Sequence, residues 1–189
     1  MKSDYCLNLQ RTNKSGERKN KLSKKNIVLI GMPSCGKSVT GVVLAKALKM
    51  KFIDADLLIQ EEAGKGLQDI INEDGIEAFK QLEERVLKTV SLENAVIATG
   101  GSAVYYESAM KHLKENGTVV YIQVSLDTVK QRLSNIKTRG VAMVKGQTLD
   151  DLYAMRVPLY EKYADVTVLS DNSCTMEDTV ERIIEEIKK

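Results

Sequence analysis

The chain has 189 residues, of which 43% are hydrophobic and 29% charged, and its formal net charge is +2. This length suits one domain with a sizeable core, and a charge this small gives no argument for nucleic-acid binding, which we therefore do not expect. Apolar runs fall short of the roughly 18 residues that suggest a membrane span, so we expect no transmembrane helix. The cysteines at positions 6, 35 and 174 lack metal-ligand spacing, and their odd number argues against a disulfide framework, which favours a cytoplasmic protein.

Residues 1–25 differ in amino-acid composition from the rest of the chain. The segment RTNKSGERKNKLSKK is basic, polar and almost free of apolar residues, a composition typical of a flexible extension. It lacks the apolar core of a secretory signal, and its cations are mostly Lys, whereas transit peptides are rich in Arg. We therefore expect a single folded domain over residues 26–189.

The first folded segment carries a phosphate-binding signature. An apolar run at 27–30 leads into GMPSCGKS at 31–38, which satisfies G-x-x-x-x-G-K-[ST], and a helical pattern follows. Glycines 31 and 36 let successive backbone N–H groups face one concavity, and a helix start near Lys37 adds its positive dipole end. Lys37 would reach the β- and γ-phosphates of a nucleotide, and the Ser38 hydroxyl would bind Mg²⁺. An ordinary βα turn would not explain why Lys and Ser follow directly.

We assign seven residues of this segment to nucleotide binding: Gly31, Ser34, Cys35, Gly36, Lys37, Ser38 and Val39. Cys35 lies near a helix start, where a thiol can be acidified. The simpler interpretation, an inert small loop residue, is favoured.

Strands and helices alternate through the remainder. Further strands are predicted at 52–54, 95–99, 118–124 and 166–169. Helices are predicted between 56 and 91, with breaks at the glycines 64, 66 and 75, and at 108–115, 126–133, 149–163 and 176–187. Short apolar strands separated by helices predict an α/β fold with a parallel sheet covered on both faces.

Polar residues follow the predicted strands where ligands of such sheets collect. Asp54 and Asp56 follow the second strand. One carboxylate suits the water shell of Mg²⁺, and the other could accept a hydrogen bond from an incoming hydroxyl and take its proton. Alternatively, Asp56 caps the next helix. Gly100 and Gly101 follow the third strand and either let the backbone approach a ligand or form a plain turn. With the phosphate loop, these groups should line one cleft.

Three cations are candidates for the same site. Lys80 lies in the charged helix EAFKQLEERVL, Arg139 lies in an aperiodic stretch over about 134–148, and Arg156 precedes VPLYEKYAD. A mobile lid that carries Arg139 would exclude water and neutralise charge during phosphoryl transfer. Each of the three could instead be a solvated surface cation.

The chain resembles the shikimate kinase family over nearly all of residues 26–170. The phosphate loop, FIDAD, GIEAFKQLEERVL, IATGGSAV, GTVVYIQV and RVPLYEKYAD occur in the family's order. The resemblance implies a P-loop, nucleoside-monophosphate-kinase-like fold with a five-stranded parallel sheet and a mobile lid. It also implies transfer of the ATP γ-phosphate to a ring hydroxyl of shikimate, with ATP and Mg²⁺ as cofactors.

The resemblance also implies residue roles. Lys37, Asp56 and Arg139 would be catalytic, Asp54 and Ser38 would support Mg²⁺, and Arg132 would lie near the adenine. The substrate-binding set would be Asp56, Lys80, Gly100, Gly101, Ser102 and Arg156, with Arg156 paired to the acceptor carboxylate. A small-molecule substrate and a monomer are expected.

The chain departs from the family pattern on the acceptor side. Lys80 stands where the family usually has Arg, Ser102 replaces the third of three glycines, and Arg139 is followed by Gly140, where Pro is common. A lysine offers a point charge, whereas Arg grips a carboxylate with a planar fork. A kinase of another small hydroxylated metabolite therefore stays open. A second alternative is a nucleotide-binding module without catalysis. The basic extension raises a third alternative, in which it tethers the protein to an acidic partner or nucleic acid.

Overall fold

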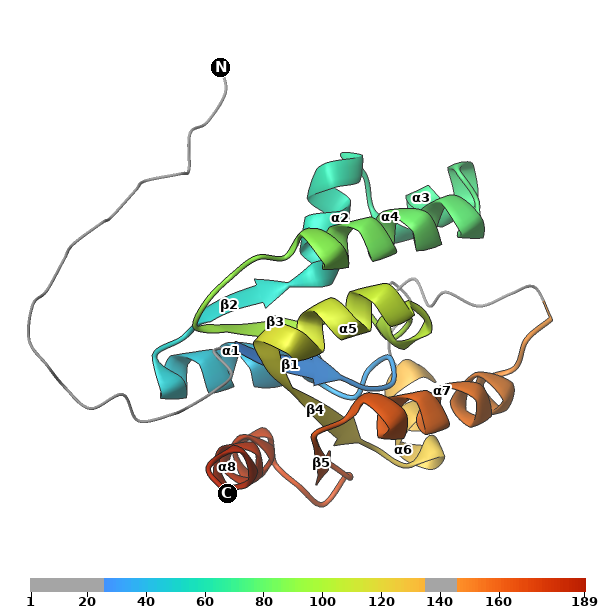
Figure 1. Ribbon diagram of the computed structural model, residues 1–189. Helices are drawn as coiled ribbons and strands as arrows, with labels where there is room; N and C mark the ends of the chain where they lie inside the picture. The colour runs from blue at the N-terminus through green and yellow to red at the C-terminus, as the bar shows by residue number, and fades with distance from the viewer. Residues whose placement is uncertain (1–25, 135–145) are drawn as a thin grey trace, which may run out of the picture.

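A computed structural model describes residues 26–134 and 146–189. Its strands form one five-stranded parallel sheet in the order β2-β3-β1-β4-β5 (Figure 1). Their bounds are β1 Asn26–Ile30, β2 Lys51–Asp54, β3 Ala95–Ala98, β4 Gly117–Gln123 and β5 Val166–Leu169. In register, Val28 of the central strand lies opposite Ile97 of β3 and Val119 of β4. The predicted five-stranded parallel sheet is confirmed.

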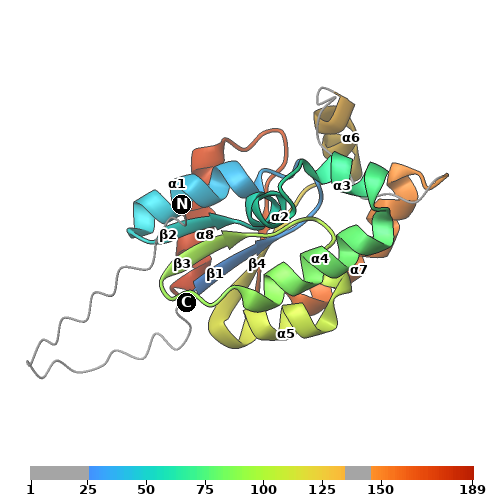
Figure 2. The same ribbon diagram turned by 90° about the horizontal axis from the view of Figure 1, so that it is seen from above.

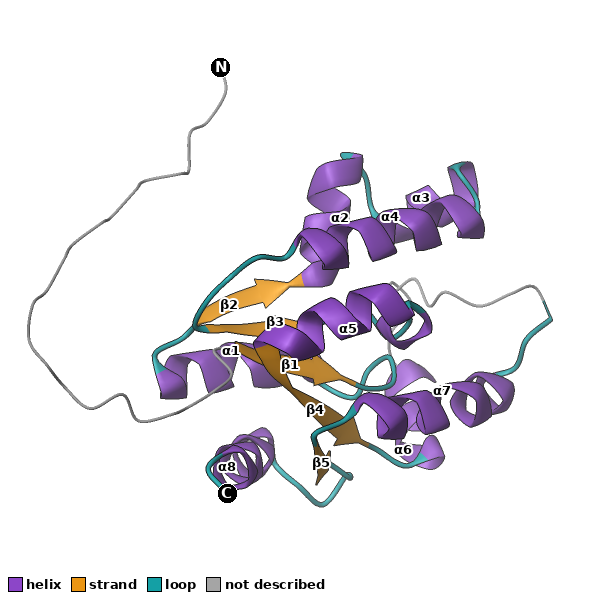
Figure 3. Cartoon of the chain, in the orientation of Figure 1, coloured by secondary structure: helices purple, strands orange, loops and turns teal. Residues whose placement is uncertain are grey.

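Helices cover both faces of the sheet (Figures 1 and 2). The helices are α1 Lys37–Leu48, α2 Ala55–Ala63, α3 Leu67–Glu73, α4 Ile76–Thr89, α5 Glu107–Asn116, α6 Leu126–Ser134, α7 Leu149–Tyr163 and α8 Met176–Ile187. Helices α1 and α8 pack together on one face, whereas α5 and α7 lie on the other and α4 packs against α5. Figure 3 shows this three-layer arrangement by type of element. A short 3₁₀ helix after β3, η1 Ala103–Tyr105, was not predicted.

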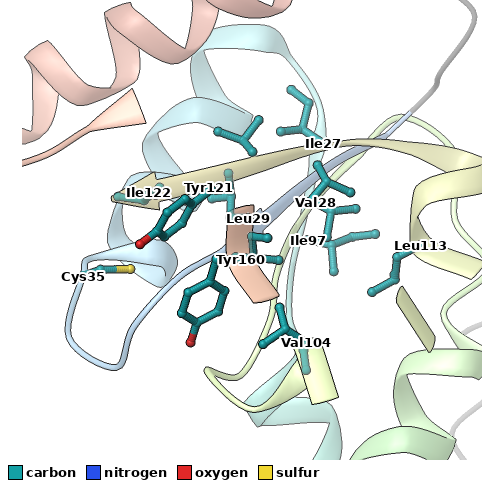
Figure 4. Packing of buried hydrophobic residues seen from close by; sticks show 14 of the residues in the cluster. Ile27, Val28, Leu29, Cys35, Ile97, Val104, Leu113, Tyr121, Ile122 and Tyr160 are labelled. Atoms are coloured by element: carbon teal, nitrogen blue, oxygen red, sulfur yellow. The ribbon is translucent and has the colours of Figure 1, made fainter. Parts of the chain in front are cut away.

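The main core surrounds the central strands. Every residue of β1 is buried, and all except Asn26 at its start are apolar, because helices cover both faces of this strand. Figure 4 shows Val28, Leu29 and Ile97 inside this cluster, together with Tyr121 of β4 and Tyr160 of α7. The two tyrosine rings are stacked, with 5.1 Å between their centroids. Burial of this apolar surface stabilises the sheet whose carboxyl edge carries the site.

A second, smaller core joins α2, α3 and α4. Its buried members are Ile59, Ile70, Phe79 and Val86. Because this cluster is separate from the main core, the three helices form a unit that stands beside the carboxyl ends of β2 and β3 (Figure 1). Within the described ranges, no helix combines the length and apolar character that a bilayer crossing requires.

Candidate active site

A cleft of about 490 Å³ lies at the carboxyl ends of β1, β2 and β3. The three polar groups that follow these strands all contribute to its walls, and α4 and α7 add one charged residue each. Of the predicted site residues, the following line the cleft: Ser34, Gly36, Lys37, Ser38, Asp54, Asp56, Gly100, Gly101, Ser102 and Arg156. The strand topology thus brings together segments more than 100 residues apart in the chain.

The phosphate loop is folded around its lysine. Lys37 is 8% exposed, and its ammonium donates hydrogen bonds to the backbone oxygens of Gly31 and Met32, both at 2.9 Å. Gly36 caps α1 with a φ of +101°, and Ser34 has a φ of +63°, so the loop curls back and directs main-chain groups inward. The Ser34 hydroxyl is buried without a hydrogen-bond partner in the described part of the chain. A curled loop with a buried cation and an unsatisfied hydroxyl fits a phosphate group.

Gly31 and Cys35 are the loop residues that pack against the protein interior. A Cβ on Gly31 would lie 2.6 Å from the Ile122 backbone oxygen and 2.9 Å from Cys35 Sγ, so the loop can pack on β4 only with glycine there. Cys35 is buried at the edge of the main core (Figure 4), and its Sγ lies 3.7 Å from Lys37 Nζ. Neither residue lines the cleft, and we infer that both shape the loop.

Two other residues assigned to the nucleotide lie outside the cleft lining. Val39 is an exposed residue of α1. The Arg132 guanidinium donates to the backbone oxygen of Cys35 over 3.5 Å, which connects α6 to the phosphate loop. Their contacts with a nucleotide stay predictions.

Asp54 and Asp56, at the end of β2 and the start of α2, have different roles in the structure. Asp54 is the N-cap of α2, and its Oδ1 accepts a hydrogen bond from the Asp56 amide at 3.0 Å. The alternative in which Asp56 caps this helix is therefore wrong, because Asp54 does so. Asp56 lies in the first turn of α2 and lines the cleft.

The Asp54 carboxylate and the Ser38 hydroxyl face the same cleft. Both are hard oxygen donors of the kind that Mg²⁺ binds. The described ranges hold no cluster of three or more His, Cys, Asp or Glu side chains suited to a metal. These two residues therefore fit an ion that keeps most of its ligands as water or phosphate oxygens.

The Gly100–Gly101 turn is enclosed by the protein's own side chains. A Cβ on Gly100 would collide with Glu83 Oε1 and would lie 3.1 Å from Asp56 Oδ1. A Cβ on Gly101 would lie 3.0 Å from an Arg156 nitrogen and 3.1 Å from the Pro33 ring. These close approaches explain why both positions need glycine: two carboxyl groups and a guanidinium converge on this turn.

Glu83 is a further cleft residue that the sequence motifs above did not identify. It is fully buried on α4, yet it lines the cleft. Its Oε2 accepts hydrogen bonds from the Ser102 hydroxyl at 2.6 Å and the Tyr106 hydroxyl at 2.8 Å. Burial raises the pKa of Glu83 from 4.5 to about 7, and the nearby Asp56 adds to the rise, whereas the two hydroxyl donors and Arg156 oppose it. The available signal was its position one helical turn after the apolar Phe79, on the buried face of α4.

Arg156 is held inside the acceptor side of the cleft. It is 2% exposed, and its Nε donates to the Tyr105 hydroxyl over 3.2 Å. One turn later on α7, the Tyr160 hydroxyl donates to the Gly101 backbone oxygen at 2.6 Å, so the same helix fixes the glycine turn. A buried guanidinium held in this way is suited to recognise a carboxylate.

Lys80 does not share this arrangement. Its ammonium pairs with Glu77 on the same helix at 2.6 Å, its side chain is 37% exposed, and it is not part of the cleft lining. Its contact with an acceptor carboxylate stays a prediction. Arg139 and most of the predicted lid at 134–148 lie outside the described residues.

Sequence comparisons connect this geometry to a known family. A family model described as shikimate kinase matches residues 33–188. A shikimate kinase of Sulfurihydrogenibium sp. is 36% identical over 166 residues, which cover 87% of this chain and 99% of that protein. A shikimate kinase of Mannheimia succiniciproducens is also 36% identical, over 78% of this chain and 87% of its own length.

Solved structures agree with the sequence match. A shikimate kinase from Acinetobacter baumannii, solved in complex with shikimate, superposes with a TM-score of 0.81 at 31% identity, over 89% of this chain and 95% of that chain. A shikimate kinase from Aquifex aeolicus superposes with a TM-score of 0.74 at 30% identity, over 86% and 96% of the two chains. The match therefore covers both the sheet and the elements that line the cleft.

Proposed function

The chain belongs to the shikimate kinase family, and from that premise we propose that it transfers the γ-phosphoryl group of ATP to a hydroxyl of shikimate. The observation that carries this proposal is one cleft that holds a phosphate loop, a carboxylate and a buried arginine together. These are the parts that phosphoryl transfer to a carboxylate-bearing alcohol requires.

Each group has a distinct task in this reaction. Asp56 orients the acceptor hydroxyl and accepts its proton while the hydroxyl oxygen bonds to the γ-phosphorus and the bond to the bridging oxygen of ADP breaks. Lys37 stabilises the negative charge that develops on the phosphates. Arg156 binds the acceptor carboxylate and so sets the orientation of the ring.

Mg²⁺ fits the Ser38 hydroxyl and the Asp54 carboxylate, and when bound it neutralises phosphate charge. Arg132 borders the adenine side through its contact with the phosphate loop. Arg139 lies outside the described residues, and only the family resemblance assigns it to a lid over the phosphates. The other two assignments rest on the resemblance together with the positions of Ser38, Asp54 and Arg132.

A second candidate is a kinase of the same fold that acts on another hydroxylated metabolite. It is favoured by one observation: the Lys80 ammonium is already paired with Glu77, and the cleft lining in the described ranges holds only two cations, Lys37 and Arg156. An acceptor that needs a single guanidinium would suit such a pocket.

We also propose that the enzyme acts as a cytoplasmic monomer. The chain is long enough for one domain with its own core, which is sufficient for a monomer. The two described cysteines, Cys35 and Cys174, are free thiols, as expected in a reducing compartment. Sedimentation analysis at micromolar concentration tests the oligomeric state, and a stable dimer would contradict this part of the proposal.

The central experiment measures ADP release with MgATP and a panel of acceptors at millimolar concentration. We expect turnover with shikimate that exceeds turnover with uncharged polyols, because only a carboxylate pairs with Arg156. Turnover with another acceptor alone would support the second candidate. Nucleotide binding by calorimetry without turnover on any acceptor would identify a catalytically silent module.

A further inference from the structure

The Ser102 hydroxyl makes a hydrogen bond that a glycine at this position could not make. Its side chain is 6% exposed, and its Oγ donates to Glu83 Oε2 over 2.6 Å. The Tyr106 hydroxyl donates to the same oxygen. Both donors lie on the segment that begins with the Gly100–Gly101 turn, so one short stretch of chain holds the carboxyl group from one side.

The two donors leave the other oxygen of Glu83 facing the Gly100 turn. Oε1 is buried and has no hydrogen-bond partner among the described residues. It lies against the α-carbon of Gly100, and Asp56 Oδ1 approaches the same point. A buried acceptor that makes no hydrogen bond costs free energy. A bound hydroxyl that donates to Oε1, or a proton on Oε1, would remove this cost.

We propose that Ser102 is a positioning residue of the acceptor site: its hydroxyl fixes the Glu83 carboxyl so that Oε1 faces the Gly100 turn beside Asp56. This inference rests on the proposed function, since it assumes that the acceptor occupies this half of the cleft. Ser102 acts through Glu83 and need not touch the acceptor itself.

The charges around Glu83 give this arrangement a measurable signature. Asp56 on α2 opposes ionisation of Glu83, whereas Arg156 on α7 and the hydroxyls of Ser102 and Tyr106 favour it. Hydrogen bonds to a charged group are stronger than those to a neutral one. Loss of the Ser102 hydroxyl must therefore shift Glu83 toward its protonated form and leave its carboxyl group freer to turn.

Glu84, the neighbour of Glu83 on α4, and its hydrogen-bond donor Ser108 provide a matched control. Ser108 Oγ donates to Glu84 Oε1 over 2.5 Å, which is also a serine-to-glutamate hydrogen bond between α4 and the segment after β3. This pair is exposed, and neither residue lines the cleft. Ser108→Ala therefore removes the same chemical contact without touching the acceptor site.

The first test titrates the free protein labelled with ¹³C in its glutamate carboxyl groups, with the Glu83 signal assigned by its loss in Glu83→Gln. We expect a midpoint near pH 7 for Glu83 and a rise of about half to one pH unit in Ser102→Ala. Ser108→Ala should leave the midpoint in place. A Glu83 midpoint that is unchanged in Ser102→Ala, with a native melting temperature, overturns the inference.

The second test measures steady-state kinetics with shikimate and MgATP. We expect Ser102→Ala to raise the KM for shikimate about three- to tenfold, with the KM for ATP unchanged. The inflection in the pH profile of kcat/KM for shikimate should move to higher pH in Ser102→Ala and disappear in Glu83→Gln. An equal rise in both KM values, or an unmoved inflection, contradicts a positioning role.

The two tests separate this inference from the proposed function. If the wild-type protein shows no turnover with shikimate in the kinetic assay, the proposed function is overturned. The carboxyl titration does not require turnover, so it still decides whether Ser102 controls Glu83.

Discussion

The Tyr105 ring lies beneath the Arg156 guanidinium, with 5.3 Å between the guanidinium carbon and the ring centroid, and the Tyr105 hydroxyl accepts a hydrogen bond from Arg156 Nε over 3.2 Å. One tyrosine thus contacts the arginine through both its π face and its polar end. This pairing holds the arginine in place before an acceptor arrives, and preorganisation of this kind lowers the entropic cost of binding.

Tyr105→Phe is expected to weaken acceptor binding because the ring stays while the hydrogen bond to Nε is lost. The KM for shikimate should rise about two- to tenfold, with little change in the KM for ATP. Tyr163→Phe is the matched control, since its ring also lies beside a cation, Lys162, at 4.9 Å but outside the cleft. An unchanged KM in Tyr105→Phe would mean that this hydrogen bond does not position Arg156.

Lys37→Ala should abolish phosphoryl transfer, because no other cation in the described phosphate loop can stabilise the β- and γ-phosphates. We expect kcat to fall by about a hundredfold or more. Lys46→Ala, an exposed lysine on the same helix, should behave like the wild type. Retained kcat in Lys37→Ala would refute the assignment of the loop.

Lys80→Arg tests the acceptor side of the cleft. If shikimate is the acceptor, a two-pronged guanidinium at this position should lower the KM for shikimate, by about tenfold at most. Glu77 competes for the same cation at 2.6 Å, so the gain should be larger in the Glu77→Gln background. A KM that is unchanged or raised in both backgrounds would count against shikimate or against a role for this position.

Gly100→Ala should destabilise the fold and the site together, because the new methyl group would collide with the Glu83 carboxyl. We expect a loss of about 1–3 kcal/mol in the free energy of unfolding, measured by urea denaturation. The same change in a Glu83→Ala background should cost much less, since the colliding oxygen is gone. Equal costs in the two backgrounds would show that the collision is not the cause.

Glu83 should make stability depend on pH in a defined window. The unfolded chain releases this proton near pH 4.5, whereas the folded protein retains it up to about pH 7. The folded state therefore binds more protons than the unfolded state in this window. As the pH rises from 4.5 to 7, the contribution of Glu83 to the free energy of unfolding falls by about 3 kcal/mol. Urea denaturation across this range should show a smaller loss in Glu83→Gln than in the wild type.

Glu84→Gln is the control for this measurement, because Glu84 is the partly exposed neighbour of Glu83 on α4. Glu84→Gln should keep the fall in stability that the buried Glu83 causes in this window. A fall as large in Glu83→Gln as in the wild type would contradict a buried acid with a raised pKa.

The local sequence determined much of the fold. Buried strands such as β1 read as short apolar runs, and helix starts carry their own signals, as in the capping boxes of Thr148 with Asp151 and Thr175 with Asp178. The phosphate loop was readable because its chemistry is contained in eight consecutive residues. The rule that ligands gather at the carboxyl ends of parallel strands then placed Asp54, Asp56 and the Gly100 turn near that loop.

Only the tertiary structure decided how the acceptor side is built. Glu83 reads as one more charge on a charged helix. Its spacing from Phe79 places it on the buried face of α4, but that spacing does not show which groups it contacts there. The fold gives Glu83 and its neighbour Glu84 different environments, because α4 turns one toward Ser102 and Tyr106 and the other toward Ser108. Likewise, the sequence did not show that the Lys80 ammonium pairs with Glu77, and its contact with an acceptor stays a prediction. Burial and partner choice depend on contacts between segments far apart in the chain, and a single sequence does not record those contacts.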